Sequence, residues 1–190
     1  KLSHQESTAK QIGWITGFPS FRLDGTTTLW THHYYVNTSP GGALYTQDSR
    51  YHSGWETRQM NFRAAKCDAC NSQSVTAAGP NSTPNTSTPS VSLNSSGISA
   101  SWNWQAPNVR VDNYSYLPSY GRWEHFYYGA ARGSTYQAEP GIQMTNTSGN
   151  MVVDNYAYVE WFKYIDGVTD LGDSTYTRFG SRLFTRFLIP

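Results

Sequence analysis

The sequence predicts an all-β protein, an antiparallel β-sandwich with Greek-key or jelly-roll-like connections, built from two related halves. Three observations lead to this fold class. Helical periodicity is almost absent, short extended runs alternate with turns rich in Gly, Pro and Asn, and a pair of motifs occurs twice in the same order. Aromatic residues make up 15% and charged residues only 14% of the 190 residues, a balance that favours a folded chain.

The repeated motifs suggest an internal duplication. Residues 19–24 and 107–112 both read Pro-x-φ-Arg-φ-Asp, where φ is apolar, and a Trp-x-His-x-Tyr-Tyr motif begins at Trp30 and again at Trp123. Repeats in constant order are typical of duplicated units. We therefore expect Trp30 and Trp123 to occupy equivalent places, with chance similarity in an aromatic-rich chain as the alternative.

Composition divides the chain into four parts. Residues 1–18 form an N-terminal extension or strand, and 19–70 form the first half-repeat. Residues 71–101 are dominated by Ser, Thr, Asn and Pro, which predicts a linker or surface loop because such a segment buries little apolar surface. Residues 102–190 form the second half-repeat.

Alternating side chains locate the strands of the first half. Ile12, Trp14 and Phe18 share one side of a period-2 pattern, which predicts a strand with one buried face. Asp24-Gly25 lies between two extended runs and predicts a hairpin. Residues 55–63 fit either a strand or a short helix.

The second half has the clearer strands. Residues 150–165 carry apolar groups on both faces, so this strand should be central in its sheet. Residues 174–189 follow after a loop of eight residues, a short connection that favours antiparallel pairing within the same chain. Arg178, Arg182 and Arg186 share one face of this last strand, which we expect to be solvated or to face glycans rather than to be buried.

The two cysteines, Cys67 and Cys70, form a Cys-x-x-Cys pair. A structural zinc site needs four ligands, and a thioredoxin-like pair needs a βαβ unit, neither of which the sequence offers. We favour a disulfide that holds a turn in an oxidising compartment.

No catalytic motif stands out, so we predict that the protein is not an enzyme and needs no cofactor. His32 and His125 occupy equivalent motif positions and could share a metal, but hydrogen-bonded histidines in an aromatic layer are the preferred interpretation. Glu124 and Glu160 lie in aromatic strands and could form a glycosidase pair at an unknown separation. A loop with Asp166, Asp170 and Asp173 is a calcium candidate, although a solvated turn explains it as well, and we assign no metal.

Several Asn-x-Ser/Thr sites are candidates for glycosylation, which marks exposed surface in an exported chain. They are Asn37, Asn81, Asn85, Asn94, Asn113 and Asn146.

Composition also restricts location and partners. The net charge of +1 argues against a nucleic-acid partner and against electrostatic docking to an acidic membrane. No apolar run has the roughly 18 residues of a membrane-spanning helix. A polar chain that begins at Lys1 suggests an exported protein whose signal has been removed, located outside the cell or at its surface.

These features lead to a functional prediction. We expect an extracellular structural protein, a fibre or surface-layer subunit that polymerises with copies of itself and carries or binds glycans. Residues 1–18 would complete the sheet of a neighbour, with Ile12, Trp14 and Phe18 as anchors. A secreted carbohydrate-binding module is the alternative, because exposed aromatic rings stack on sugars, and a glycoside hydrolase or other hydrolase is the third.

Overall fold

The computed structural model consists of strands and connecting turns throughout the part of the chain that it describes, with no helix there long and apolar enough to cross a membrane. The predicted all-β class with mostly antiparallel sheets is therefore confirmed. The structure describes residues 2–5, 13–23, 29–40, 56–95, 97–106, 108–128, 136–148, 150–165 and 175–189.

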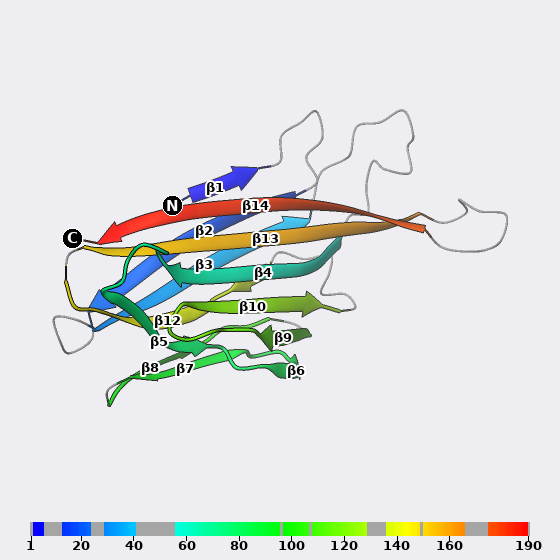
Figure 1. Ribbon diagram of the computed structural model, residues 1–190. Coiled ribbons are helices and arrows are strands. Elements are labelled where there is room, and N and C mark those ends of the chain that lie inside the picture. The colour runs from blue at the N-terminus through cyan, green and yellow to red at the C-terminus, as the bar shows by residue number, and fades with distance from the viewer. Residues whose placement is uncertain are drawn as a thin grey trace.

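The first large sheet collects strands from the beginning and the middle of the chain. Its strand order is β1-β2-β3-β12-β5, and β11 also pairs with β3 (Figure 1). The bounds are β1 Leu2–Gln5, β2 Gly13–Leu23, β3 Leu29–Pro40, β5 Gln73–Gly79, β11 Tyr136–Ala138 and β12 Gly141–Asn146.

The second large sheet has the order β14-β13-β4-β10-β9-β6, and Figure 1 shows β14, β13 and β4 in front of β2 and β3 of the first sheet. The predicted central strand is β13, which pairs with β14 on one side and β4 on the other. The C-terminal strand pairs antiparallel with β13 of its own chain, as predicted. The bounds are β4 Glu56–Lys66, β6 Thr83–Thr86, β9 Val109–Asn113, β10 Tyr120–Tyr127, β13 Met151–Ile165 and β14 Thr175–Ile189.

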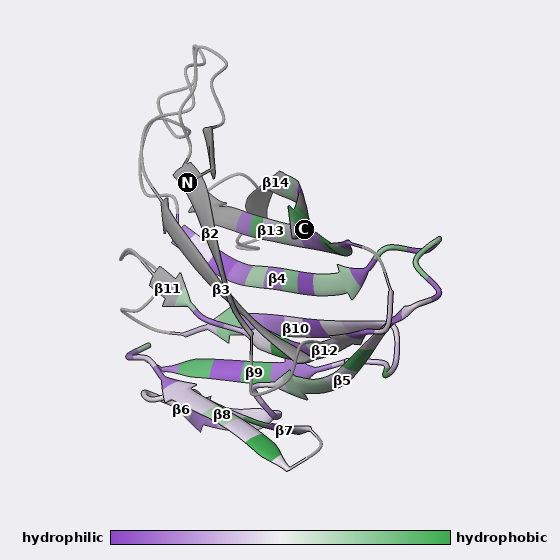
Figure 2. Cartoon of the chain, turned by 90° about the vertical axis from the view of Figure 1, so that its left-hand side faces the viewer, coloured by the Kyte–Doolittle hydropathy of each residue, from purple (hydrophilic) through white to green (hydrophobic). Residues whose placement is uncertain are grey.

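A separate two-stranded sheet consists of β7 (Ser90–Ser95) and β8 (Ile98–Asn103). Gly97 in the intervening turn has a φ of 78°, a left-handed conformation that glycine adopts without steric cost. The hairpin lies with β6 at the end of the molecule opposite β14 and the C-terminus (Figure 2).

One apolar cluster joins the three sheets. It combines inward side chains of the second sheet, such as Trp123 and Val159, with Ile142 of the first sheet and Leu93 of the hairpin, all of them fully buried. Gly121 lies against this cluster, where an added Cβ would overlap the Trp123 ring. The two large sheets therefore pack through interlocking side chains.

The expected linker at residues 71–101 is corrected by the structure, because this segment contains strands β5 to β8. Its polar composition conceals a period-2 pattern in which Val91 and Leu93 are buried while Ser90, Ser92 and Asn94 are exposed. Alternation lets a strand contribute to the core although half of its residues are polar.

The N-terminal strand is not left free for a neighbour. β2 pairs along its full length with β3 of its own chain, placing Trp14 opposite Ser39 and Phe18 opposite Tyr35, and β1 pairs with β2. Ile12 lies outside the described residues. The short β2–β3 connection favours this hairpin, so the expectation that residues 1–18 are donated loses its structural basis.

The two tryptophan motifs lie in comparable hairpins of different sheets. Trp30 is in β3, which pairs with the preceding β2, and Trp123 is in β10, which pairs with the preceding β9. The registers differ, since Trp30 is opposite Leu23 whereas Trp123 is opposite Asn113, two residues beyond the position that corresponds to Leu23. The equivalence of two halves stays a prediction.

Candidate functional site

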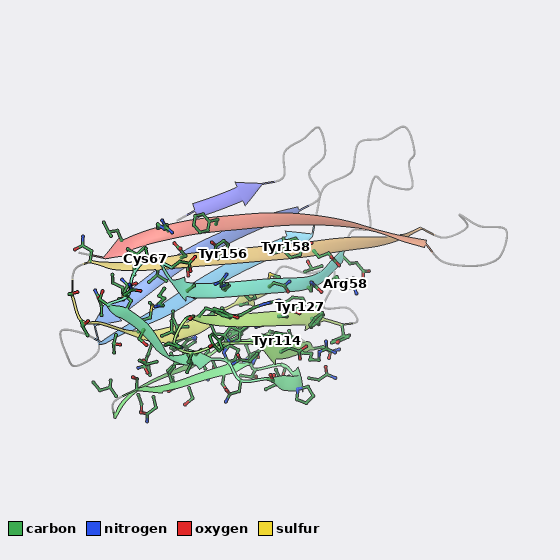
Figure 3. The ribbon with its side chains drawn as sticks, in the orientation of Figure 1. Arg58, Cys67, Tyr114, Tyr127, Tyr156 and Tyr158 are labelled. Carbon is green, nitrogen blue, oxygen red and sulfur yellow. A yellow bond between two sulfur atoms is a disulfide. The ribbon has the colours of Figure 1, made fainter. Side chains whose placement is uncertain are left out.

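The outer face of the second sheet carries an open groove across four strands. Alternation directs Met60 and Phe62 into the core and leaves Asn61 and Arg63 on the outer face of β4. The groove has a volume of about 650 Å³, and its lining residues are Asn61, Phe62, Arg63, Arg122, Tyr156, Ala157, Tyr158 and Phe184. Figure 3 shows Tyr156 and Tyr158 on β13, where this strand runs between β14 and β4.

The pairing of the strands aligns side chains in one continuous row through the groove. Arg63 is opposite Arg122 on one side and Tyr156 on the other, and Tyr156 is in turn opposite Phe184. The Tyr156 and Phe184 rings contact each other at 4.7 Å between centroids. Register alone therefore places a pair of arginines and a pair of aromatic residues side by side on the outer face.

Ion pairs neutralise four carboxylates on the outer face. Arg122 contacts Glu124 at 2.9 Å, Arg110 contacts Asp112 at 3.1 Å, Arg58 contacts Glu160 at 2.8 Å, and Arg186 contacts Asp154 at 2.6 Å. The Asp154 carboxylate also raises the pKa of the Arg186 guanidinium, first through its hydrogen bond and then through its charge. Glu124 and Glu160 are thus each neutralised by an arginine, which does not suit the acid and base of a glycosidase.

Arg63 differs from these arginines because the described residues give it no ion pair. Its guanidinium carbon lies 4.5 Å from the Tyr120 ring centroid and 5.8 Å from that of Tyr156. Its Nε is buried and has no hydrogen-bond partner within the described part of the chain. The aromatic faces stabilise the cation but provide no acceptor for its remaining N–H groups.

Large apolar side chains are exposed beside this groove. Phe184 is 51% and Leu188 63% exposed on β14, and Tyr156 is 43% exposed on β13. A second exposed group, Tyr114, Tyr116 and Leu117, lies in the β9–β10 connection. Adjoining exposed apolar residues of this size are typical of an interaction surface.

The segment that includes the hairpin contains no charged residue. Residues 71–109, 39 positions in all, have no Asp, Glu, Lys, Arg or His, although 14% of the whole chain is charged. On the hairpin, apolar and polar side chains alternate, as Val91 and Ala100 are buried while Ser92 and Ser101 are exposed. The hydrogen bonds described between hairpin and body involve side chains, from Trp102 Nε1 to the Glu139 carbonyl and from Gln143 Nε2 to the Ile98 carbonyl.

His125 is a fully buried core residue. Its ring lies edge-on to Phe62 at 4.9 Å and 6.1 Å from Trp104, and neither ring nitrogen has a hydrogen-bond partner among the residues that the structure describes. Burial lowers the pKa of His125 from 6.5 to about 3. The expected aromatic layer is present around His125, but the expected hydrogen bonds to its ring are not. His32 is in β3, paired with Phe21 and Ile142.

Two further predicted sites are the cysteine pair and the aspartate loop considered for calcium. Cys67 and Cys70 are joined by a disulfide with an S–S distance of 1.98 Å, the pairing that the sequence favoured. Asp166, Asp170 and Asp173 lie outside the described residues, and within those residues no cluster of three or more His, Cys, Asp or Glu could hold a metal.

The glycosylation candidates differ in accessibility. Asn81, Asn85 and Asn94 are exposed. The side-chain amide Nδ2 of Asn113 donates a hydrogen bond to the Pro80 carbonyl at 2.7 Å, and Asn146 is buried. Asn37 lies in β3. Among the candidates whose exposure the structure describes, the three in the uncharged segment are therefore the ones with an exposed side chain.

Comparison with solved structures places this fold among those of pore-forming proteins. The chain is similar to a structure described as a pore forming protein, with a TM-score of 0.58 and 11% identity over 98% of this chain and 88% of that one. It is also similar to Clostridium perfringens delta-toxin, with a TM-score of 0.56 and 12% identity over 93% and 84% of the two chains. For the Clostridium perfringens NetB toxin in its membrane-inserted form the TM-score is 0.50, with 8% identity over 98% and 92%.

At sequence level, neither a family model nor a curated protein matches the chain. The structural similarity nevertheless corrects our functional prediction. The neighbours are pore-forming proteins and toxins, and the N-terminal strand that was expected to join fibre subunits belongs to its own sheet. The predicted filament subunit with inter-subunit strand complementation was wrong. Sequence reasoning missed the residues that line the groove. What these residues share is their position in the strand register, which pairs strands that lie far apart in the sequence.

Proposed function

We propose that this protein is an extracellular membrane-permeabilising protein that acts in the manner of a pore-forming toxin. The observation that carries the proposal is the uncharged hairpin β7–β8, whose two faces differ sharply in polarity. The similarity of the whole chain to pore-forming folds agrees with it. No enzymatic step is part of this function.

The uncharged segment has the length and pattern of a membrane-crossing hairpin. A strand crosses a bilayer with roughly 9–11 residues, with apolar side chains toward lipid and polar ones toward water. Residues 71–109 are long enough for two such strands and a turn. A charged side chain on the lipid-facing side would cost roughly 2–4 kcal/mol near the middle of the bilayer, so the lack of charge favours insertion.

An inserted hairpin requires copies of the same chain. In lipid, every backbone donor and acceptor must be paired, and a single hairpin leaves both of its outer edges unpaired. Hairpins from neighbouring subunits would supply the missing partners. We therefore retain the expectation of self-association, now through membrane-inserted hairpins and not through the N-terminal strand.

Ion selectivity of the pore tests this assignment. Ser92 and Ser101 are exposed and directly opposite each other in the hairpin, so they would face the water-filled lumen. We expect dye release from lipid vesicles by the wild type, cation-selective conductance in planar bilayers for S92D/S101D, and anion-selective conductance for S92K/S101K. D68K, a charge reversal at an exposed position outside the uncharged segment, is the matched control and should leave selectivity unchanged.

Two outcomes would contradict the proposal. One is the absence of release from vesicles of every composition, including native membrane extracts. The other is release whose ion selectivity is the same in the Asp and Lys double variants, which would place the pore lining elsewhere.

The proposal also retains two predictions made from the sequence, namely two related halves and glycosylation. The recurrence of the Pro-x-φ-Arg-φ-Asp and Trp-x-His-x-Tyr-Tyr motifs supports a sandwich of two related halves. Exposure supports glycans at Asn81, Asn85 or Asn94, although glycans there would have to be accommodated during insertion of the segment.

A further inference from the structure

We propose that the groove around Arg63 binds the phosphate of an anionic lipid headgroup and thereby docks the outer face of the β14-β13-β4-β10-β9-β6 sheet on a membrane. This inference rests on the proposed function and names the partner that the protein meets before its hairpin inserts. Its experiment separates docking from permeabilisation.

The charges of the outer face point to an anionic ligand. Four of its carboxylates are neutralised by arginines, whereas Arg63 has no carboxylate partner among the described residues. Arg122 lies directly opposite Arg63 but is paired with Glu124, so the positive charge that the groove offers to a ligand is that of Arg63. An anion placed there would balance the charge of Arg63 and accept hydrogen bonds from its guanidinium.

The surroundings of Arg63 select phosphate over a quaternary ammonium group. Ammonium headgroups bind to the faces of aromatic rings. The Tyr156 ring of the groove and the neighbouring Tyr120 ring already face the Arg63 guanidinium at 5.8 and 4.5 Å, so the groove presents a held cation rather than an empty aromatic cage. A guanidinium held in this way is preorganised for a planar, two-point contact with phosphate oxygens.

The apolar rim identifies a lipid surface as the source of the phosphate. Phe184 and Leu188 are exposed on the outer face of the edge strand β14, with Tyr156 between Phe184 and Arg63 in the register. Aromatic and aliphatic side chains beside a cation suit the boundary between headgroups and acyl chains. A free phosphate would make no use of this apolar rim. Because the net charge is only +1, the protein has little long-range attraction to acidic membranes, and recognition must be local.

Vesicle binding tests the docking site. The full-length chain is sedimented with vesicles of phosphatidylcholine alone and of phosphatidylcholine mixed with phosphatidylglycerol. We expect the wild type to prefer the mixed vesicles and R63Q to bind them roughly 10- to 100-fold more weakly, the loss of a charge-assisted hydrogen-bonding group. R63K, which keeps the charge but not the two-point geometry, should be intermediate.

R110Q is the matched control. Arg110 lies on the same face, with its guanidinium 4.3 Å from the Phe126 ring centroid, but it is paired with Asp112 and lies outside the groove. Its substitution should leave vesicle binding within about twofold, since a solvent-exposed pair contributes little. F184S and L188S, at exposed positions where folding is not at risk, should each weaken binding severalfold without changing the preference for phosphatidylglycerol.

Three results would overturn the proposal. The first is wild-type binding by R63Q. The second is Arg63-dependent binding of inorganic phosphate with no binding to vesicles, which would assign the groove to a free phosphate. The third is a change in oligomeric state for F184S in analytical ultracentrifugation with vesicle binding intact, which would assign the face to a second copy of the chain.

Tethering distinguishes this proposal from the proposed function. When a His-tagged chain is anchored to nickel-chelating lipids, docking is no longer needed, so R63Q should release vesicle contents as well as the wild type does. If the tethered wild type releases nothing while free R63Q still fails to bind, the permeabilising function is wrong and the docking site stands.

Discussion

Acidification should destabilise this protein through His125. The folded protein holds this ring neutral, because it is fully buried and its pKa is about 3, whereas the unfolded chain takes up a proton near the ordinary pKa of 6.5. Between these two pH values the unfolded state binds more protons than the folded state. Stability is therefore complete above about pH 6.5 and is lost as the pH falls toward 3.

The size of the effect follows from the two pKa values. At about 1.4 kcal/mol per pH unit, the full loss is at most about 5 kcal/mol, and linkage places about 2 kcal/mol of it between pH 7.5 and pH 5. This is a large share of a typical free energy of unfolding, about 5–15 kcal/mol. Because Phe62 and Trp104 contact the ring, protonation would disturb the core where the segment after β8 packs on β10.

Urea denaturation of the wild type and H125L at pH 7.5 and pH 5 measures this contribution. Leucine has a similar volume, no titrating group and no buried polar nitrogen, so H125L should lose about 2 kcal/mol less than the wild type on acidification. Every other side chain is the same in both proteins, so its contribution to the pH dependence cancels in the difference. If the two proteins lose the same free energy of unfolding, His125 does not carry the acid sensitivity and the argument from its burial fails.

Two further predictions concern the packing and the disulfide. G121A should lower the free energy of unfolding by about 1–3 kcal/mol in thermal or urea denaturation, because the new Cβ overlaps the buried Trp123 ring and the Ile142 side chain; an unchanged midpoint would contradict the close packing. Thiol titration of the unfolded, unreduced protein should detect no free thiol, since Cys67 and Cys70 are paired; two reactive thiols per chain would refute the disulfide.

The sequence was sufficient for elements whose pattern is local. Alternation over residues 150–165 predicted a central strand, and the short connection to residues 174–189 predicted its antiparallel partner, both of which the structure contains. The same rule, applied to residues 90–95, would have revealed β7 within a segment that composition alone described as a linker. Composition does not record the order of the residues, whereas burial in a strand depends on the alternation of apolar and polar residues.

The groove could not be predicted because it depends on long-range register. Arg63, Arg122 and Tyr156 come from three strands far apart in the sequence, and each looks like an ordinary surface residue on its own. A shift of one residue in any of these strands would move its member to the opposite face. The unpaired state of Arg63 likewise becomes visible only after the neighbouring arginines are matched with their carboxylates.

The separate β7–β8 sheet is a unit that can open while the two large sheets stay folded. Its ladder connects only β7 and β8, so lifting it would leave the backbone hydrogen bonds of both six-stranded sheets in place. What resists the motion is the burial of side chains such as Val91 and Leu93 and the bonds made by Trp102 and Gln143. Local opening of this kind requires less free energy than global unfolding. Amide hydrogens on the sheets should therefore stay protected from exchange under conditions in which those of the hairpin already exchange, so that one chain can change shape at one end while the other end remains folded.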